Sequence, residues 1–242
     1  MCYDRQGQPS LVPRAGVVVF HPTTAETINP VAGLTGQEEQ HHGFKLAQRG
    51  FVVICPRCFL WQDARDYREA VAKFQQRQPD ARGMVKMLFD GMRAVDVLLQ
   101  QPDVDPRRIG ASGHSLGAKE TLYLMAFDER VRAGVFSEGG LAVTASNWDA
   151  VWYLGPEIRQ PACGLEHHQL VALIAPRPFL VLAGGRGGAD NEESCRLIRA
   201  ALPVYQLYTA SARVGVWNHA AGHRVPPAAF ERWTEWLQTY LP

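Results

Sequence analysis

The stretch RIGASGHSLGAKE at residues 108–120 decides the fold. A short apolar run leads into Ser115, which stands between Gly113 and Gly117, and a helix-forming stretch follows. The pattern G-x-S-x-G at a strand-to-helix turn strains the serine backbone and exposes the hydroxyl. Side chains at 113 and 117 would collide with the neighbouring strand and helix. The stretch therefore predicts a nucleophilic Ser115, whose alternative is a buried serine in a tight turn.

On either side of this stretch, strand-like runs alternate with helix-like segments. Strands are expected at 16–20, 51–55, 107–113, 131–137, 178–184 and 213–217. Helices are expected at 35–50, 81–101, 115–126, 191–202 and from Pro226 onward. Such alternation is typical of βαβ units. We therefore predict an α/β fold with a mostly parallel sheet of about six strands and helices on both faces.

The length of the chain fits one domain. Its 242 residues bury enough surface to need no disulfide or metal, so we expect a single domain over 1–242. One connection, 138–177, is much longer than the others and leaves a strand at its carboxyl end, where ligands bind in open α/β sheets. We expect this long insertion to be an active-site loop.

Charge and cysteine content exclude several function classes. The formal net charge is +1, and no apolar run is long enough to cross a bilayer, so neither nucleic acid nor membrane is an expected partner. The stretch MCYDRQGQPS has no apolar signal core, and an odd count of five cysteines favours free thiols. We expect a cytoplasmic protein without metal or cofactor, and the oligomeric state stays open.

A nucleophilic serine needs a base, and the base needs an acid. His223 in NHAAGHRVP follows the last expected strand and precedes the closing helix, which favours it over His219. For the acid we favour Asp190 in GGRGGAD, after the fifth strand, although it could also cap the next helix. The rival is Glu138, at the end of the fourth strand.

Two backbone amides are expected to bind a developing oxyanion. The first is the N–H of Leu116, at the start of the helix after Ser115. The second belongs in the loop after the first strand, HPTT, where we choose Thr23 and then Thr24. Pro22 has no N–H and cannot serve.

These residues resemble the α/β-hydrolase superfamily, through GHSLGAKE and the later Gly-His before a final helix. The segments VDPRRIGASGHSLGAKETLYLMAFDERVRAGVFSEGG, SNWDAVWYLG and LIAPRPFLVLAGG are similar to its dienelactone-hydrolase-like and acetyl-xylan-esterase-like branch, from about Gly16 onward. Glucuronoyl esterases look like relatives, since Lys119 and Glu138 match their positions, although Leu116-Gly117 replaces their Arg-Asn. Ser115 replaces the cysteine of dienelactone hydrolases proper. The short start implies a pared-down N-terminus.

The resemblance implies a serine carboxylic-ester hydrolase with a Ser-His-acid triad and an acyl-enzyme intermediate. Its partner would be a small-molecule ester, with a short acyl chain or a carbohydrate-linked group. Lys119, Trp148 and Trp152 would contact the substrate. The alternatives are a serine peptidase or amidase of the prolyl-oligopeptidase kind and a non-catalytic binding module of the same fold.

Overall fold

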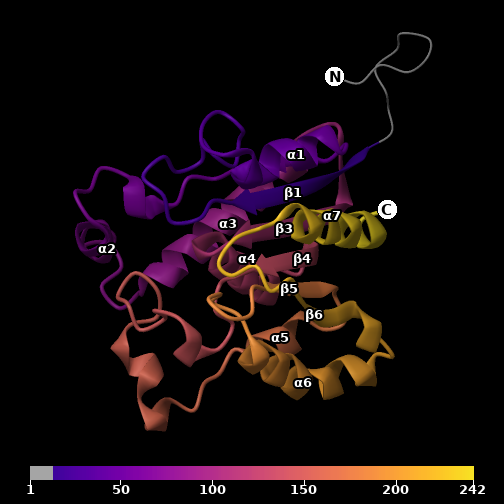
Figure 1. Cartoon of the computed structure of the whole chain (residues 1–242). Helices are drawn as coiled ribbons and strands as arrows, with labels where there is room; N and C mark the ends of the chain where they lie inside the picture. The colour runs from indigo at the N-terminus through magenta and orange to yellow at the C-terminus, as the bar shows by residue number, and fades with distance from the viewer. Residues whose placement is uncertain (1–12) are drawn as a thin grey trace.

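The computed structural model describes residues 13–242, which contain one six-stranded sheet (Figure 1). The strand order is β2-β1-β3-β4-β5-β6, and all neighbouring strands are parallel. The strands are β1 (Arg14–Phe20), β2 (Val52–Ile54), β3 (Val104–His114), β4 (Val131–Ser137), β5 (Phe179–Ala183) and β6 (Val214–Asn218). The predicted α/β-hydrolase fold class, with about six mostly parallel strands, is confirmed.

Helices cover both faces of this sheet. They are α1 (His42–Gln48), α2 (Tyr67–Gln75), α3 (Gly83–Leu99), α4 (Leu116–Phe127), α5 (His168–Ile174), α6 (Glu192–Leu207) and α7 (Pro227–Tyr240). On one face, α1 and α7 pack on Val17 and Val19 of β1 through Leu46 and Trp233. The remaining helices pack on the other face, which includes Val18. Alternate side chains of each strand thus enter two separate cores, which explains the continuous apolar runs.

Several predicted boundaries were wrong. The helix expected at 35–50 begins only at His42, after a short 3-10 turn at Glu38–Gln40. Gly36 has φ +81, which a right-handed helix does not allow. Two short helices, α2 and α5, were not predicted, and α6 extends beyond residue 202 to Leu207. The segment 138–177 is therefore not all loop, because α5 lies within it.

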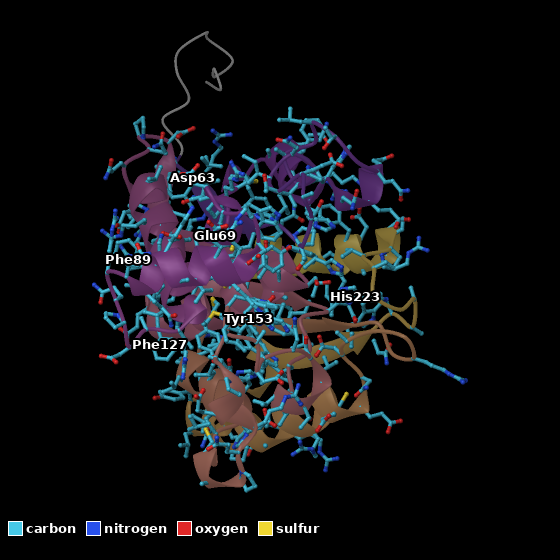
Figure 2. All side chains as sticks on the ribbon, turned by 90° about the vertical axis from the view of Figure 1, so that its left-hand side faces the viewer. Asp63, Glu69, Phe89, Phe127, Tyr153 and His223 are labelled. Carbon is cyan, nitrogen blue, oxygen red and sulfur yellow. The ribbon has the colours of Figure 1, made fainter. Side chains whose placement is uncertain are left out.

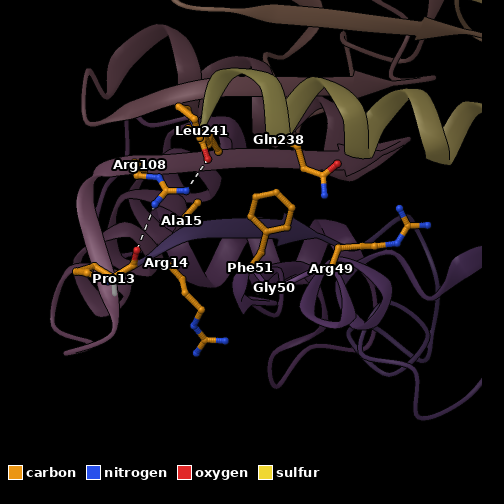
Figure 3. A pocket seen from close by; sticks show the side chains of 10 residues that line it. Pro13, Arg14, Ala15, Arg49, Gly50, Phe51, Arg108, Gln238 and Leu241 are labelled. Carbon is orange, nitrogen blue, oxygen red and sulfur yellow. Dashed lines mark hydrogen bonds between the residues drawn. The ribbon is translucent and has the colours of Figure 1, made fainter. Parts of the chain in front are cut away.

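A cavity of about 300 Å³ lies where β1 and β3 begin, at the opposite end of the sheet from Ser115 (Figure 3). Arg108 crosses it and donates to the carbonyl oxygens of Pro13 and Leu241. Arg14 and Arg49, also in its lining, pair with Asp103 and Glu231. The cationic groups of this cavity are therefore engaged within the protein.

No helix in the described part of the chain is long and apolar enough to span a membrane. The stretch MCYDRQGQPS, on which the expected location rests, lies outside the described residues. Within 13–242, no three His, Cys, Asp or Glu side chains form a group suited to a metal ion.

Candidate active site

Ser115 occupies a sharp turn between β3 and α4. Its backbone has φ 58 and ψ −115, a conformation that non-glycine residues rarely adopt. A Cβ on Gly113 would lie 2.4 Å from the carbonyl carbon of Gly117, and a Cβ on Gly117 would lie 2.4 Å from the carbonyl oxygen of Phe20. Both glycines are therefore required by close backbone contact, as the sequence predicts, and the turn holds the hydroxyl at the carboxyl end of the sheet.

His223 lies beside this hydroxyl. It belongs to the loop between β6 and α7, on the opposite side of the molecule from Phe89 and Phe127 (Figure 2). Its Nε2 is 3.1 Å from Ser115 Oγ, within hydrogen-bond distance. The ring packs against His114, with centroids 4.8 Å apart. Ser115 and His223 thus have the geometry of a nucleophile and its base.

The carboxylate nearest to His223 is Glu138. Its Oε2 lies 3.6 Å from His223 Nδ1, and its side chain is 0% exposed. Like Ser115, Glu138 has a positive φ (55), a backbone conformation that non-glycine residues rarely adopt. Burial raises the pKa of Glu138, while His223 and the amides of Ala189 and Asp190 lower it by stabilising the anion.

Asp190, the acid favoured by sequence, lies elsewhere. Its side chain accepts hydrogen bonds from the amides of Gly140 (2.9 Å) and Leu141 (2.7 Å) and from Ser194 Oγ (2.6 Å). Burial raises the pKa of Asp190, and these donors oppose that shift. Of the two acids weighed from the sequence, Glu138 therefore faces His223, and Asp190 faces the backbone after Glu138.

The two carboxylates bind each other's loops. Glu138 accepts hydrogen bonds from the backbone amides of residues 189–190, and Asp190 accepts hydrogen bonds from the backbone amides of residues 140–141. We call this reciprocal arrangement the carboxylate clasp. It leaves no room for side chains beside Glu138, because a Cβ on Gly184 or Gly188 would lie 2.8 or 2.5 Å from its oxygens. Gly184 and Gly188 of GGRGGAD thus leave space for the Glu138 side chain, which follows β4.

The expected oxyanion donors both lie at the site. Leu116 is the first residue of α4, so its N–H has no acceptor within the helix. Thr23 and Thr24 line the same cavity as Ser115. The start of α4 also lies close to the end of β1, because a Cβ on Gly117 would lie 2.4 Å from the carbonyl oxygen of Phe20.

This cavity has a volume of about 270 Å³. It is lined by Pro22, Thr23, Thr24, Gln37, Glu39, Gln40, His42, His114, Ser115, His223, Arg224 and Val225. An ion pair of 2.6 Å between Arg224 and Glu39 forms part of its wall. Most lining groups are polar, so the cavity suits a small ligand with hydroxyl or carbonyl groups.

Three residues expected to contact the substrate do not line this cavity. Lys119 is buried and donates to Gly139 O (2.5 Å) and Ser146 Oγ (2.7 Å), with its ammonium 4.2 Å from the Trp148 ring centroid. Burial lowers its pKa to about 7. Trp148 is fully buried and donates to Gly140 O, while Trp152 packs against Tyr67. These side chains support the loop that follows Glu138.

Two histidines near the site were not assigned by sequence. His114 is largely buried at the cavity wall, and this burial lowers its pKa well below the usual value, so it is neutral beside His223. His42 lines the cavity and packs on Trp233, with ring centroids 5.0 Å apart. The position of His114, directly before Ser115, was the available sequence signal that it lies at the site.

The family is decided by a sequence match. The dienelactone hydrolase family model matches residues 6–151, more than half of the chain. The chain belongs to the dienelactone hydrolase family. It is also 27% identical over 162 residues to YtaP of Bacillus subtilis, a protein provisionally named a hydrolase. That match covers 64% of this chain and about half (53%) of the Bacillus protein.

Solved structures show the same fold. A glucuronoyl esterase of Teredinibacter turnerae superposes on this dienelactone hydrolase family member with a TM-score of 0.72 and 19% sequence identity. The match covers 96% of the present chain and 67% of the esterase. One from Solibacter usitatus matches 96% with a TM-score of 0.74 and 16% identity, over 75% of its chain. The catalytic domain of the Hypocrea jecorina glucuronoyl esterase matches 99% with a TM-score of 0.69 and 18% identity, over 69% of its chain. At these identities the likeness shows the fold.

Proposed function

We propose that this dienelactone hydrolase family member is a serine carboxylic-ester hydrolase with the triad Ser115, His223 and Glu138. The observation that carries the proposal is the line of contacts from Ser115 Oγ to His223 Nε2 (3.1 Å) and from His223 Nδ1 to Glu138 (3.6 Å). A serine hydroxyl becomes nucleophilic when a neutral imidazole accepts its proton and a carboxylate orients that imidazole.

The reaction would proceed through an acyl-enzyme. Ser115 Oγ attacks the ester carbonyl carbon while its proton passes to His223 Nε2. The amides of Leu116 and Thr23 bind the oxyanion, and Glu138 stabilises the imidazolium. The intermediate collapses with loss of the alcohol, which takes the proton from His223. A water molecule, deprotonated by His223, then hydrolyses the acyl-enzyme and releases the acid.

The cavity favours short-chain or carbohydrate-linked esters. Its volume of about 270 Å³ is small, below the range of about 300–1,000 Å³ typical of drug-sized ligands. Its walls carry Gln37, Gln40 and Thr24, which suit hydroxyl groups better than a long alkyl chain. The similar solved structures named glucuronoyl esterases support the carbohydrate-linked substrate class.

Hydrolysis of p-nitrophenyl esters from acetate to decanoate tests the proposal. We expect the wild type to prefer acetate, and Ser115→Ala to lose at least about 10³-fold in kcat. Ser112→Ala is the matched control, because Ser112 is a buried serine of β3, three residues before Ser115, and does not line the cavity. Activity that survives in Ser115→Ala, or a folded wild type inactive on every ester, would refute the proposal.

A further inference from the structure

The second carboxylate oxygen of Glu138, Oε1, faces the ring of His219. These two side chains are 0% and 1% exposed, and His219 Nε2 lies 4.0 Å from Oε1. Among the described residues, neither atom has a hydrogen-bond partner. A buried polar atom without a hydrogen-bond partner destabilises the fold, and a charged one does so more strongly. Two such atoms that face each other indicate a pair that can form.

The ring of His219 is held in one tautomer. Its backbone N–H donates to Ala183 O (2.9 Å) at the end of β5, and its Nδ1 accepts the N–H of Ala221 (3.2 Å). Because Nδ1 accepts, the proton of the neutral ring is on Nε2. Burial lowers the pKa of His219, which favours this neutral form. Nε2–H is therefore a donor directed at Glu138.

We propose that His219 is a positioning residue that holds Glu138 through Oε1, so that Oε2 stays directed at His223. The hydrogen bond forms when the two side chains approach by about 1 Å. Three donors, from His219, Ala189 and Asp190, then surround the carboxylate, and His223 is the fourth. This inference rests on the proposed function, because it takes Glu138 as the acid of the triad.

Two amides of different length test this role. In His219→Asn the side-chain amide lies where Nδ1 lies in histidine, so it is too short to reach Glu138. In His219→Gln the amide nitrogen lies where Nε2 lies in histidine, so it can donate to Glu138. We expect His219→Asn to lower kcat on p-nitrophenyl acetate by about 10-fold or more with KM within about twofold. His219→Gln should retain kcat within about threefold of the wild type.

Asn218→Ala is the control for the loop itself. Asn218 directly precedes His219 in the chain, and its side chain accepts a hydrogen bond from the N–H of Ala220. Asn218→Ala removes this hydrogen bond, which does not involve Glu138, so kcat should stay within about twofold of the wild type. Thermal unfolding verifies that each variant is folded. If His219→Asn does not fold, His219→Ala replaces it with the same expected loss.

The coupling to Glu138 separates positioning from general packing. In a Glu138→Gln background, His219→Asn should cost less than about a further twofold in kcat, because the carboxylate it positions is gone. An unchanged kcat in His219→Asn, or equal losses in both backgrounds, would overturn the inference while leaving a Ser115-dependent esterase intact. Activity independent of Ser115 would refute the proposed function instead.

Discussion

Exchanging Glu138 and Asp190 separately for their amides decides which carboxylate assists His223. A unit charge 3.6 Å from the imidazolium gives about 5 kcal/mol at an effective dielectric constant of about 20. Water reduces this, since His223 is 43% exposed, and about 3–4 kcal/mol of transition-state stabilisation remains. Glu138→Gln should therefore lower kcat by about 10²–10³-fold.

Asp190→Asn should act on stability instead. The carboxylate accepts two amides and one hydroxyl, whereas an asparagine presents its NH₂ to one of these donors and loses that bond. The expected cost is about 1–3 kcal/mol in the free energy of unfolding, with kcat within about tenfold of the wild type.

The assay is steady-state hydrolysis of p-nitrophenyl acetate, with urea unfolding of each variant. A folded Asp190→Asn protein that loses as much kcat as Glu138→Gln would refute the assignment of the acid from geometry. So would Glu138→Gln with wild-type kcat.

Two further predictions concern folding stability. Gly117→Ala places a Cβ 2.4 Å from Phe20 O, so urea unfolding should show a loss of about 2–4 kcal/mol; a loss below about 1 kcal/mol would contradict the close contact. The fold lowers the pKa of Lys119 from 10.5 to about 7. Between these two pH values Lys119 is protonated in the unfolded chain and mostly neutral in the folded one, so the free energy of unfolding rises with pH by up to about 1.4 kcal/mol per pH unit. The free energy of unfolding of Lys119→Met, measured from pH 7 to 10, should lack this rise, and parallel curves for both proteins would contradict it.

The turn at Ser115 was predictable because its geometry depends on five consecutive residues. Gly113 and Gly117 permit the close contacts, and Ser115 between them takes the strained backbone. The position of His223 follows from chain order in this fold. These signals are local, so the sequence alone contains them.

The acid was not predictable in the same way. Glu138 and Asp190 follow neighbouring strands, and both lie at the carboxyl edge of the sheet. Which of them reaches His223 depends on how two loops interleave, and in particular on the positive φ of Glu138. Spacing along the chain carries no information on that turn. The pairing of His219 with Glu138 depends on the same loop geometry.

The family resemblance led us to expect that aromatic residues of the long segment contact the substrate. In the structure Trp148 is fully buried in the core, and the Lys119 ammonium lies over its ring. Sequence also did not indicate that Gly36 interrupts the helix expected from residue 35.

The carboxylate clasp separates the acid from the segment that follows it. The amides of Gly140 and Leu141 donate hydrogen bonds to Asp190, which fixes the chain there. The mostly exposed stretch 156–165, beyond the buried Trp148, can therefore change length or sequence without moving Glu138. Over evolution, or in a designed library, this stretch is where substrate range can diversify at little risk to the reaction. Insertions between Gly184 and Asp190 have no such freedom, because they would displace both carboxylates at once.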